Sequence, residues 1–172
     1  MTDVVPRVET LRLILRAFVP SDVEPYAQMM ADPEVCRFLG DGRPLERADA
    51  WRQLAQIIGH WELRGFGLWA VEERVTGRLV GRIGCYEPEG WPGFEIGYVL
   101  AREAWGRGYA REGVAAALAY ARRELGRDEI ISLIRPGNRA SIAVAEHFGA
   151  RRTHRVELFG AASDVYTYPI SA

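Results

Sequence analysis

The chain has 172 residues, 48% of them hydrophobic, and a formal net charge of −1 from 22 basic and 23 acidic side chains. This length suits one core and the composition is ordinary for a globular protein, so we expect a single domain over residues 1–172. The balanced charge argues against nucleic acid as a partner, because nucleic-acid-binding domains are normally strongly basic. No apolar run approaches the roughly 20 residues of a membrane helix, and residues 1–6 lack a signal-peptide core, so we expect no membrane partner.

Cysteine and histidine usage gives no sign of a metal centre. Cys36 and Cys85 are the only cysteines, and they form neither a metal nor a redox spacing. The three histidines also lack the spacing of metal ligands. We therefore expect no metal, and a reduced, cytoplasmic compartment.

Residues 8–16 open the chain with an alternating pattern. Leu11, Leu13 and Leu15 would share one face and charged residues much of the other, which predicts one half-buried strand. Residues 20–22 then offer a helix start, and the helix is expected to carry Met30 among its apolar residues and to stop before Pro33.

A loop with glycine and proline is predicted over residues 32–45, followed by a second helix over 46–63. Its predicted buried stripe recurs every three or four residues and consists of Trp51, Leu54, Ile58 and Trp61.

The second half of the chain reads as strands around one long helix. Strands are predicted over 66–73, 79–86, 95–100 and 130–134, and the helix over 109–125 separates the last two. A strand, a crossover helix and another strand imply a locally parallel pair. A short helix over 138–148 and a closing hairpin around Gly160 complete the prediction, which gives an α+β fold with a mixed, mostly antiparallel sheet.

The remaining elements are organised around residues 94–113, which read FEIGYVLAREAWGRGYAREG. Two glycines and an alanine in the turn at 105–110 leave the backbone bare, and the helix that follows presents unpaired N–H groups and a positive dipole end. These features suit a phosphate, and Arg107 and Arg111 add charge. A dinucleotide-binding turn fits poorly, because Arg111 stands where a third small residue is required.

This run resembles the acyl-CoA-binding motif of the GCN5-related N-acetyltransferases (GNAT family), most of all the branch with the ribosomal-protein alanine acetyltransferases (RimJ/RimL-like). Gly108 and Ala110 match the small positions of that motif, and Trp105 takes the place of Gln or Arg, as is common in that branch. Residues 9–16 resemble the opening strand of the branch. Residues 136–141 resemble its closing Asn-x-x-Ser motif, and Gly149 resembles the end of the helix that follows, so four matches in order cover nearly the whole chain.

The resemblance implies a GNAT fold: a six- or seven-stranded sheet flanked by about four helices, with a splayed central parallel pair, and residues 32–63 over the acceptor side. It implies an acetyl-CoA-dependent N-acetyltransferase that transfers the acetyl group directly to a primary amine, either a protein N-terminus or a small molecule. Homodimers are common in the family. Two alternatives remain open: an acyl-CoA-binding regulatory module without amine turnover, and a transferase for a longer acyl group.

The resemblance also assigns residues to the cofactor. The turn would hold the pyrophosphate, the end of the strand would pair with the pantetheine arm, and the Asn of the closing motif would bond that arm. The amide of Val99 or Leu100 would serve the oxyanion. The predicted cofactor-binding residues are Tyr98, Val99, Leu100, Gly106, Arg107, Gly108, Tyr109, Ala110, Arg111 and Asn138.

Two residues are candidates for proton transfer. Glu95 lies near the position where a related branch places a glutamate base, with Glu87 or a water as alternatives. Ala145 occupies the position where many family members carry a tyrosine acid. Ser141 matches a serine proposed for that role in this branch, and water remains the alternative.

Overall fold

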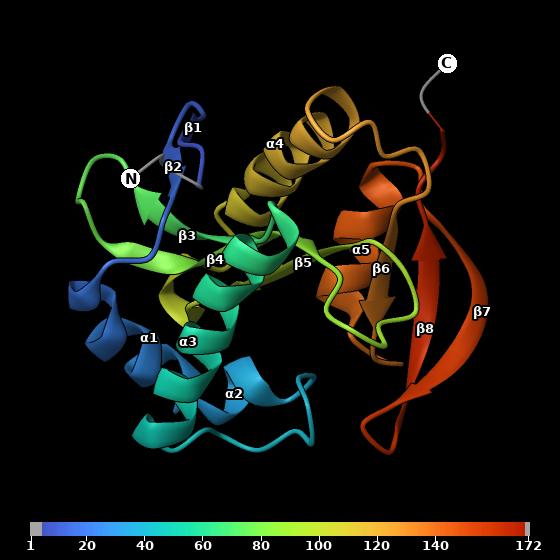
Figure 1. The fold of residues 1–172 in the computed structure, drawn as a ribbon. Helices are drawn as coiled ribbons and strands as arrows, with labels where there is room; N and C mark the ends of the chain where they lie inside the picture. The colour runs from blue at the N-terminus through green and yellow to red at the C-terminus, as the bar shows by residue number, and fades with distance from the viewer. Residues whose placement is uncertain (1–4, 171–172) are drawn as a thin grey trace.

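A computed structural model describes residues 5–170. One mixed sheet of eight strands runs through the molecule in the order β1-β2-β3-β4-β5-β6-β8-β7 (Figure 1). The strands are β1 (Val8–Glu9), β2 (Leu13–Arg16), β3 (Leu68–Glu73), β4 (Leu79–Tyr86), β5 (Glu95–Leu100), β6 (Ile131–Ile134), β7 (Arg151–Leu158) and β8 (Ala161–Thr167). The helices are η1 (Pro20–Asp22), α1 (Val23–Met30), α2 (Pro33–Cys36), α3 (Arg47–Arg64), η2 (Arg102–Ala104), α4 (Tyr109–Arg123) and α5 (Arg139–His147).

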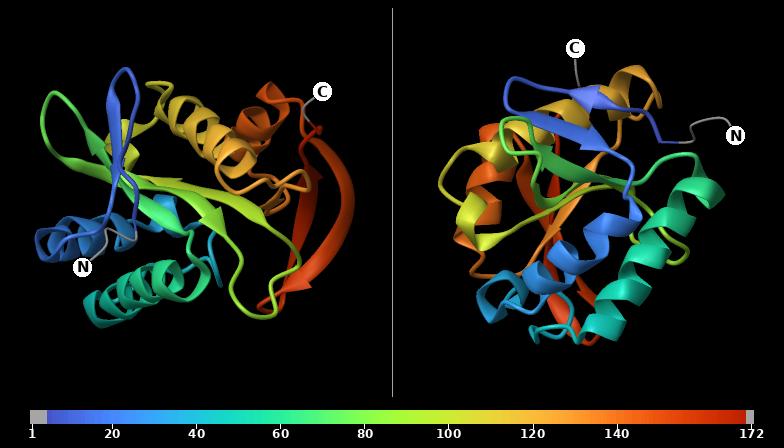
Figure 2. Two further views of the ribbon diagram at one scale, coloured as in Figure 1. Left: turned by 45° about the horizontal axis from the view of Figure 1, so that its top comes forward. Right: turned by 90° about the vertical axis from the view of Figure 1, so that its left-hand side faces the viewer.

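Helices cover both faces of the sheet. Helices α1 and α3 lie on one face, and α4 and α5 lie on the other (Figure 2). Each face buries its own apolar cluster: Ile83 and Ile96 pack toward α4, whereas Leu68 and Val99 pack toward α1 and α3. Neighbouring residues of β4 and β5 therefore point to opposite helical layers, as the two-residue period of a strand requires.

The expected α+β fold with a splayed parallel pair is confirmed. Strands β5 and β6 run parallel, and their register joins them only at Glu95 and Ile131. Beyond that point they diverge, and β6, β8 and β7 form a separate wing of the sheet (Figure 1). Within residues 5–170 the sheet has eight strands instead of six or seven, and five α-helices accompany it.

One extra strand arises because residues 8–16 do not form a single strand. Thr10 makes a tight turn: its amide donates to the Leu13 carbonyl at 2.9 Å, and its hydroxyl accepts from the Leu13 amide at 3.0 Å. The chain reverses there, and β1 pairs antiparallel with β2. Leu11 lies in the turn and is 86% exposed, so its predicted place on a buried face is wrong.

Two further predictions, both for residues 32–63, need correction. The loop predicted over 32–45 contains α2, because the Asp32 side chain caps the Glu34 amide at 2.9 Å and Pro33 suits a first helical turn. In α3 the buried stripe is rotated: Trp51 is 55% exposed, whereas Ala50 and Ile57 are buried. Small Ala50 lets α3 approach α1 more closely than Trp51 would.

We predict that Trp69→Ala lowers the free energy of unfolding by about 3–5 kcal/mol, because Trp69 is fully buried and donates to the Pro6 carbonyl at 2.8 Å. The matched control, Trp51→Ala, should change it by no more than about 0.5 kcal/mol, since that ring is exposed. Urea unfolding of both variants checks the prediction, and equal losses would contradict this assignment of the core.

Candidate functional site

The turn before α4 presents a row of unpaired amides. Gly106 and Gly108 adopt left-handed backbone angles, with φ of 71° and 80°, and a side chain at Gly106 would meet nothing within 4 Å. The first helical bond of α4 runs from the Glu112 amide to the Gly108 carbonyl. Within residues 5–170 the six amides from Gly106 to Arg111 have no protein acceptor. Such a row at the start of a 15-residue helix favours an anion.

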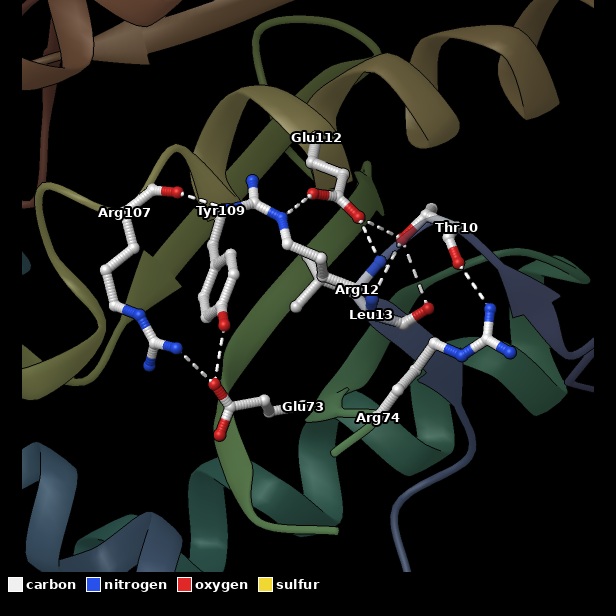
Figure 3. Close-up of polar contacts among 8 residues, drawn as sticks. All are labelled: Thr10, Arg12, Leu13, Glu73, Arg74, Arg107, Tyr109 and Glu112. Carbon is white, nitrogen blue, oxygen red and sulfur yellow. Dashed lines mark hydrogen bonds and ion pairs between the residues drawn. The ribbon is translucent and has the colours of Figure 1, made fainter. Parts of the chain in front are cut away.

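A network from the N-terminal hairpin holds this turn in place (Figure 3). The carboxylate of Glu112 accepts from the Thr10 hydroxyl at 2.6 Å, and from the main-chain amide and Nε of Arg12 at 2.7 Å each. Arg12 Nη1 donates to the Arg107 carbonyl at 2.8 Å. The Arg107–Gly108 peptide is thereby fixed by residues almost 100 positions earlier in the chain.

The predicted phosphate residue Arg107 already has a partner. Its guanidinium donates to Glu73 Oε1 at 2.5 Å, and the Tyr109 hydroxyl donates to the same oxygen at 2.5 Å (Figure 3). Hydrogen bonds from Thr76, Tyr109 and Arg107 lower the pKa of Glu73 to about 2, so the carboxylate is ionised at neutral pH. The structure therefore places Arg107 and Tyr109 as supports of the turn, and leaves Arg111 exposed.

Beyond Glu95, the main-chain N–H and C=O groups of successive β5 residues point alternately toward β4 and toward β6. The Ala101 amide donates to the Val80 carbonyl on the β4 side, and the Val99 carbonyl also lies against β4, beside Gly81. Even-numbered residues therefore turn their main-chain groups toward β6, which has already diverged. Of the three predicted pantetheine partners, Tyr98 and Leu100 direct their amides into this opening and Val99 does not.

Glu95 is buried where β5 and β6 separate. Its Oε2 accepts from Trp91 Nε1 at 2.8 Å, and its Oε1 accepts from the Leu133 amide at 3.2 Å. Burial raises the pKa of Glu95 to about 7, although these two hydrogen bonds and the charge of Arg82 lower it. A carboxylate with this pKa can take and return a proton near neutral pH.

Glu87, the alternative base, lies in a different environment. Its carboxylate is partly exposed and stands 3.7 Å from the Arg127 guanidinium. Its amide donates to Nε2 of the buried His60, whose Nδ1 donates to the Phe66 carbonyl at 2.8 Å. Burial lowers the pKa of His60, so this histidine is neutral and fixes the loop instead of exchanging protons.

The start of α5 lies across the opening from β5. The Asn138 side chain accepts from the Ser141 amide at 3.2 Å and so caps the N-terminus of α5. The Tyr98 hydroxyl donates to the Ser141 carbonyl at 2.9 Å, so β5 and α5 are linked at this point. The Tyr98 hydroxyl is thus brought next to the main chain of Ser141.

The sequence analysis did not single out the residues that support the site: Thr10, Arg12, Glu73, Trp91 and Glu112. Glu112 stands within the recognised motif, and an acid in the first turn of a helix is a usable signal. No feature of the neighbouring sequence marks Arg12 or Trp91, because only the folded structure shows that their partners are Glu112 and Glu95.

Comparisons with known proteins find relatives over most of the chain. Residues 12–151 match the family model of the acetyltransferase (GNAT) domain. The chain is 32% identical to an uncharacterized N-acetyltransferase, YoaA of Bacillus subtilis, over 79% of this chain and 77% of that protein. It is 31% identical to the FsC-acetyl coenzyme A-N(2)-transacetylase of Aspergillus fumigatus, over 90% of this chain and 67% of that protein.

Solved structures give the same result for the fold. An acetyltransferase from Agrobacterium tumefaciens has a TM-score of 0.83 and 30% identity, covering 95% of this chain and 94% of that one. RimL, a ribosomal alpha-N-protein acetyltransferase solved with coenzyme A, has a TM-score of 0.75 over 95% and 96% of the two chains. At 20% identity, RimL shows the shared fold alone.

We predict that Trp91→Phe raises the pKa of Glu95 above its value of about 7, because the substitution removes a hydrogen bond to the ionised carboxylate. Trp105→Phe is the matched control, since Trp105 donates to the Leu100 carbonyl and not to a carboxylate. A carbon-13 NMR titration, assigned with Glu95→Gln, measures each pKa. A pKa near 4.5 in the wild type would contradict the burial described.

Proposed function

The chain belongs to the GNAT family of acetyltransferases, and we propose that it transfers an acetyl group directly from acetyl-CoA to a primary amine. The observation that carries the proposal is the row of six unpaired amides at Gly106–Arg111, next to the opening between β5 and β6. This row fits the pyrophosphate of CoA, and the diverging strand edge fits its pantetheine arm. Within the described part of the chain, no group of three or more His, Cys, Asp and Glu side chains could hold a metal ion.

Binding would proceed through main-chain groups more than through charged side chains. The amides of the turn would donate to phosphate oxygens, and the exposed Arg111 would add its charge. Tyr98 and Leu100 would pair with the amides of the pantetheine arm as an additional strand, and Asn138 lies opposite them on α5. When bound, acetyl-CoA supplies an acetyl group activated as a thioester.

Direct transfer fits the state of the two cysteines. Both are buried, and burial raises the pKa of Cys85 to about 12 and that of Cys36 above its ordinary value. Both thiols are therefore protonated at neutral pH and are poor nucleophiles. We propose that the amine attacks without an acetyl-cysteine stage, and that the enzyme works in the reducing cytoplasm.

Glu95 is the proposed general base. An acceptor amine arrives largely as an ammonium ion, and Glu95, with a pKa of about 7, can accept its proton when ionised. Each carboxylate oxygen receives one hydrogen bond and keeps another lone pair free. Glu87 is less suited, since Arg127 faces its carboxylate.

The remaining steps fall to groups that face the opening. The amide of Tyr98 or Leu100 would stabilise the negative charge that develops on the acetyl oxygen. Ser141 is the proposed hydrogen-bond donor to the leaving sulfur. The Tyr98 hydroxyl donates to the Ser141 carbonyl and therefore lies next to this residue. The acceptor is a protein N-terminus or a small-molecule amine.

We predict that Gly106→Trp weakens acetyl-CoA binding roughly tenfold or more, because a bulky side chain would cover the free amides. Gly126→Trp is the matched control: Gly126 follows the other end of α4, has a similar positive φ of 61° and also faces open space. Calorimetric titration measures both affinities. Equal affinity of the two variants, or no binding by the wild type, would remove the basis of the proposal.

We predict that Glu95→Gln lowers kcat roughly 100- to 10,000-fold while acetyl-CoA affinity persists. In the wild type kcat/KM should rise with pH as Glu95 ionises, because the base acts only when ionised. The part of the rise that is due to Glu95 should level off above pH about 7, the pKa of Glu95.

The matched control, Glu87→Gln, should retain that inflection. A profile that moves with Glu87→Gln and not with Glu95→Gln would transfer the role of base to Glu87. Tight cofactor binding without turnover of any amine by the wild type would favour a regulatory module.

A further inference from the structure

Arg82 lies on the acceptor-side face of the sheet. It is the fourth residue of β4, and its register partner on β5 is Val99, which packs toward α1 and α3. Tyr86 and its register partner Glu95 occupy the same face, four residues further along β4. Arg82 and the proposed base therefore point to the same side.

The Arg82 guanidinium has no protein partner within residues 5–170. Its Nε is buried and makes no hydrogen bond, and Arg82 takes part in none of the ion pairs found in that range. Arg122 also has a buried, unpaired Nε, but another nitrogen of its guanidinium donates to the Pro169 carbonyl at 2.7 Å. A half-buried cation without a counterion is costly to desolvate, so the position of Arg82 in the folded chain calls for a ligand.

The groups whose pKa values Arg82 influences indicate where its guanidinium lies. Burial raises the pKa of each of four groups, and in all four the positive charge of Arg82 opposes that rise. The four groups are Tyr26, Cys36, Tyr86 and Glu95. They come from α1, α2, β4 and β5, so the guanidinium lies where the acceptor-side helices meet the sheet.

On this face of the sheet one pair of residues lies between the Arg82–Val99 pair and the Tyr86–Glu95 pair, and both of its members are glycines. We call this pair the rung. Gly84 pairs with Gly97 there, and a Cβ at Gly97 would stand 3.8 Å from the Glu95 carboxyl carbon. Leu68 lines the same place, 3.7 Å from that Cβ position. At Gly84 the backbone around Gly67 fills the space that a Cβ would need, whereas Gly97 is half-buried and its Cβ position has ordinary contacts. A small ligand could therefore cross over Gly97 with its charged ends toward Arg82 and Glu95.

We propose that Arg82 binds a carboxylate carried by the acceptor, so that the acceptor class is amines bearing a carboxylate a few bonds from the nitrogen. The inference rests on the proposed acetyltransferase function. Arginine presents a planar fork that matches a carboxylate with two hydrogen bonds. A single positive charge balances a carboxylate, whereas a phosphate would call for further cations. The amine at the other end would then lie beside Glu95.

The test uses acetyl-CoA and the series glycine, β-alanine, 4-aminobutyrate, 5-aminopentanoate and 6-aminohexanoate, each paired with its amide, together with short peptides. Release of free CoA thiol gives kcat/KM, and the ratio of acid to amide measures recognition of the carboxylate. In Arg82→Gln this ratio should fall roughly ten- to a hundredfold at the preferred chain length, and Arg82→Lys should restore part of it. Arg78→Gln is the matched control, because it removes an exposed charge just before β4.

Each outcome is decisive. A ratio that falls in Arg82→Gln and not in Arg78→Gln supports the inference. A ratio that does not change in Arg82→Gln, or transfer only to amines without a carboxylate, overturns it and leaves the acetyltransferase function standing. No transfer to any amine or peptide overturns the proposed function itself, and the inference with it.

Discussion

The site depends on one buried carboxylate that stands between two strands. Ile131 donates its amide to the Phe94 carbonyl at 2.9 Å, as a parallel ladder requires. The next ladder bond does not form: Leu133 donates its amide to the Glu95 side chain, and the Ile96 carbonyl accepts from the Ser132 hydroxyl at 2.6 Å. Side chains thus replace main-chain partners at the point where β5 and β6 separate. The separation leaves a free strand edge, and burial raises the pKa of the Glu95 carboxylate to about 7.

The other end of that free edge is fixed by a second carboxylate. Glu112 gathers the Thr10 hydroxyl and two nitrogens of Arg12, and Arg12 in turn holds the Arg107 carbonyl. A turn with two left-handed glycines is intrinsically mobile, because glycine loses more conformational freedom on folding than any other residue. By fixing the turn before any ligand arrives, the hairpin reduces the ordering that binding would otherwise require.

The sequence allowed prediction of the elements whose periodicity is local. The bounds 79–86 and 95–100 agree with β4 and β5, and the glycine turn stands where its composition placed it. Leu11 was misplaced because a Thr10 side chain turned an alternating segment into a hairpin. The α3 stripe was rotated because its neighbour α1, and not the hydrophobicity of Trp51, decides which residues are buried. Arg82 could not be singled out, because an arginine in a strand is ordinary in a sequence. Only the structure shows that its buried Nε has no hydrogen-bond partner.

Arg82 and Glu95 share one face of the sheet and influence each other electrostatically, yet they form no ion pair within the described chain. A direct pair would lower the pKa of Glu95 and remove its capacity to accept a proton near neutral pH. It would also occupy the guanidinium. The Gly84–Gly97 rung keeps the two charges apart and leaves each one available. A zwitterionic amine meets both needs at once, because its carboxylate neutralises the unpaired cation while its ammonium group lies beside the base. The same separation that leaves Arg82 without a counterion therefore makes this face of the sheet complementary to an amino carboxylate.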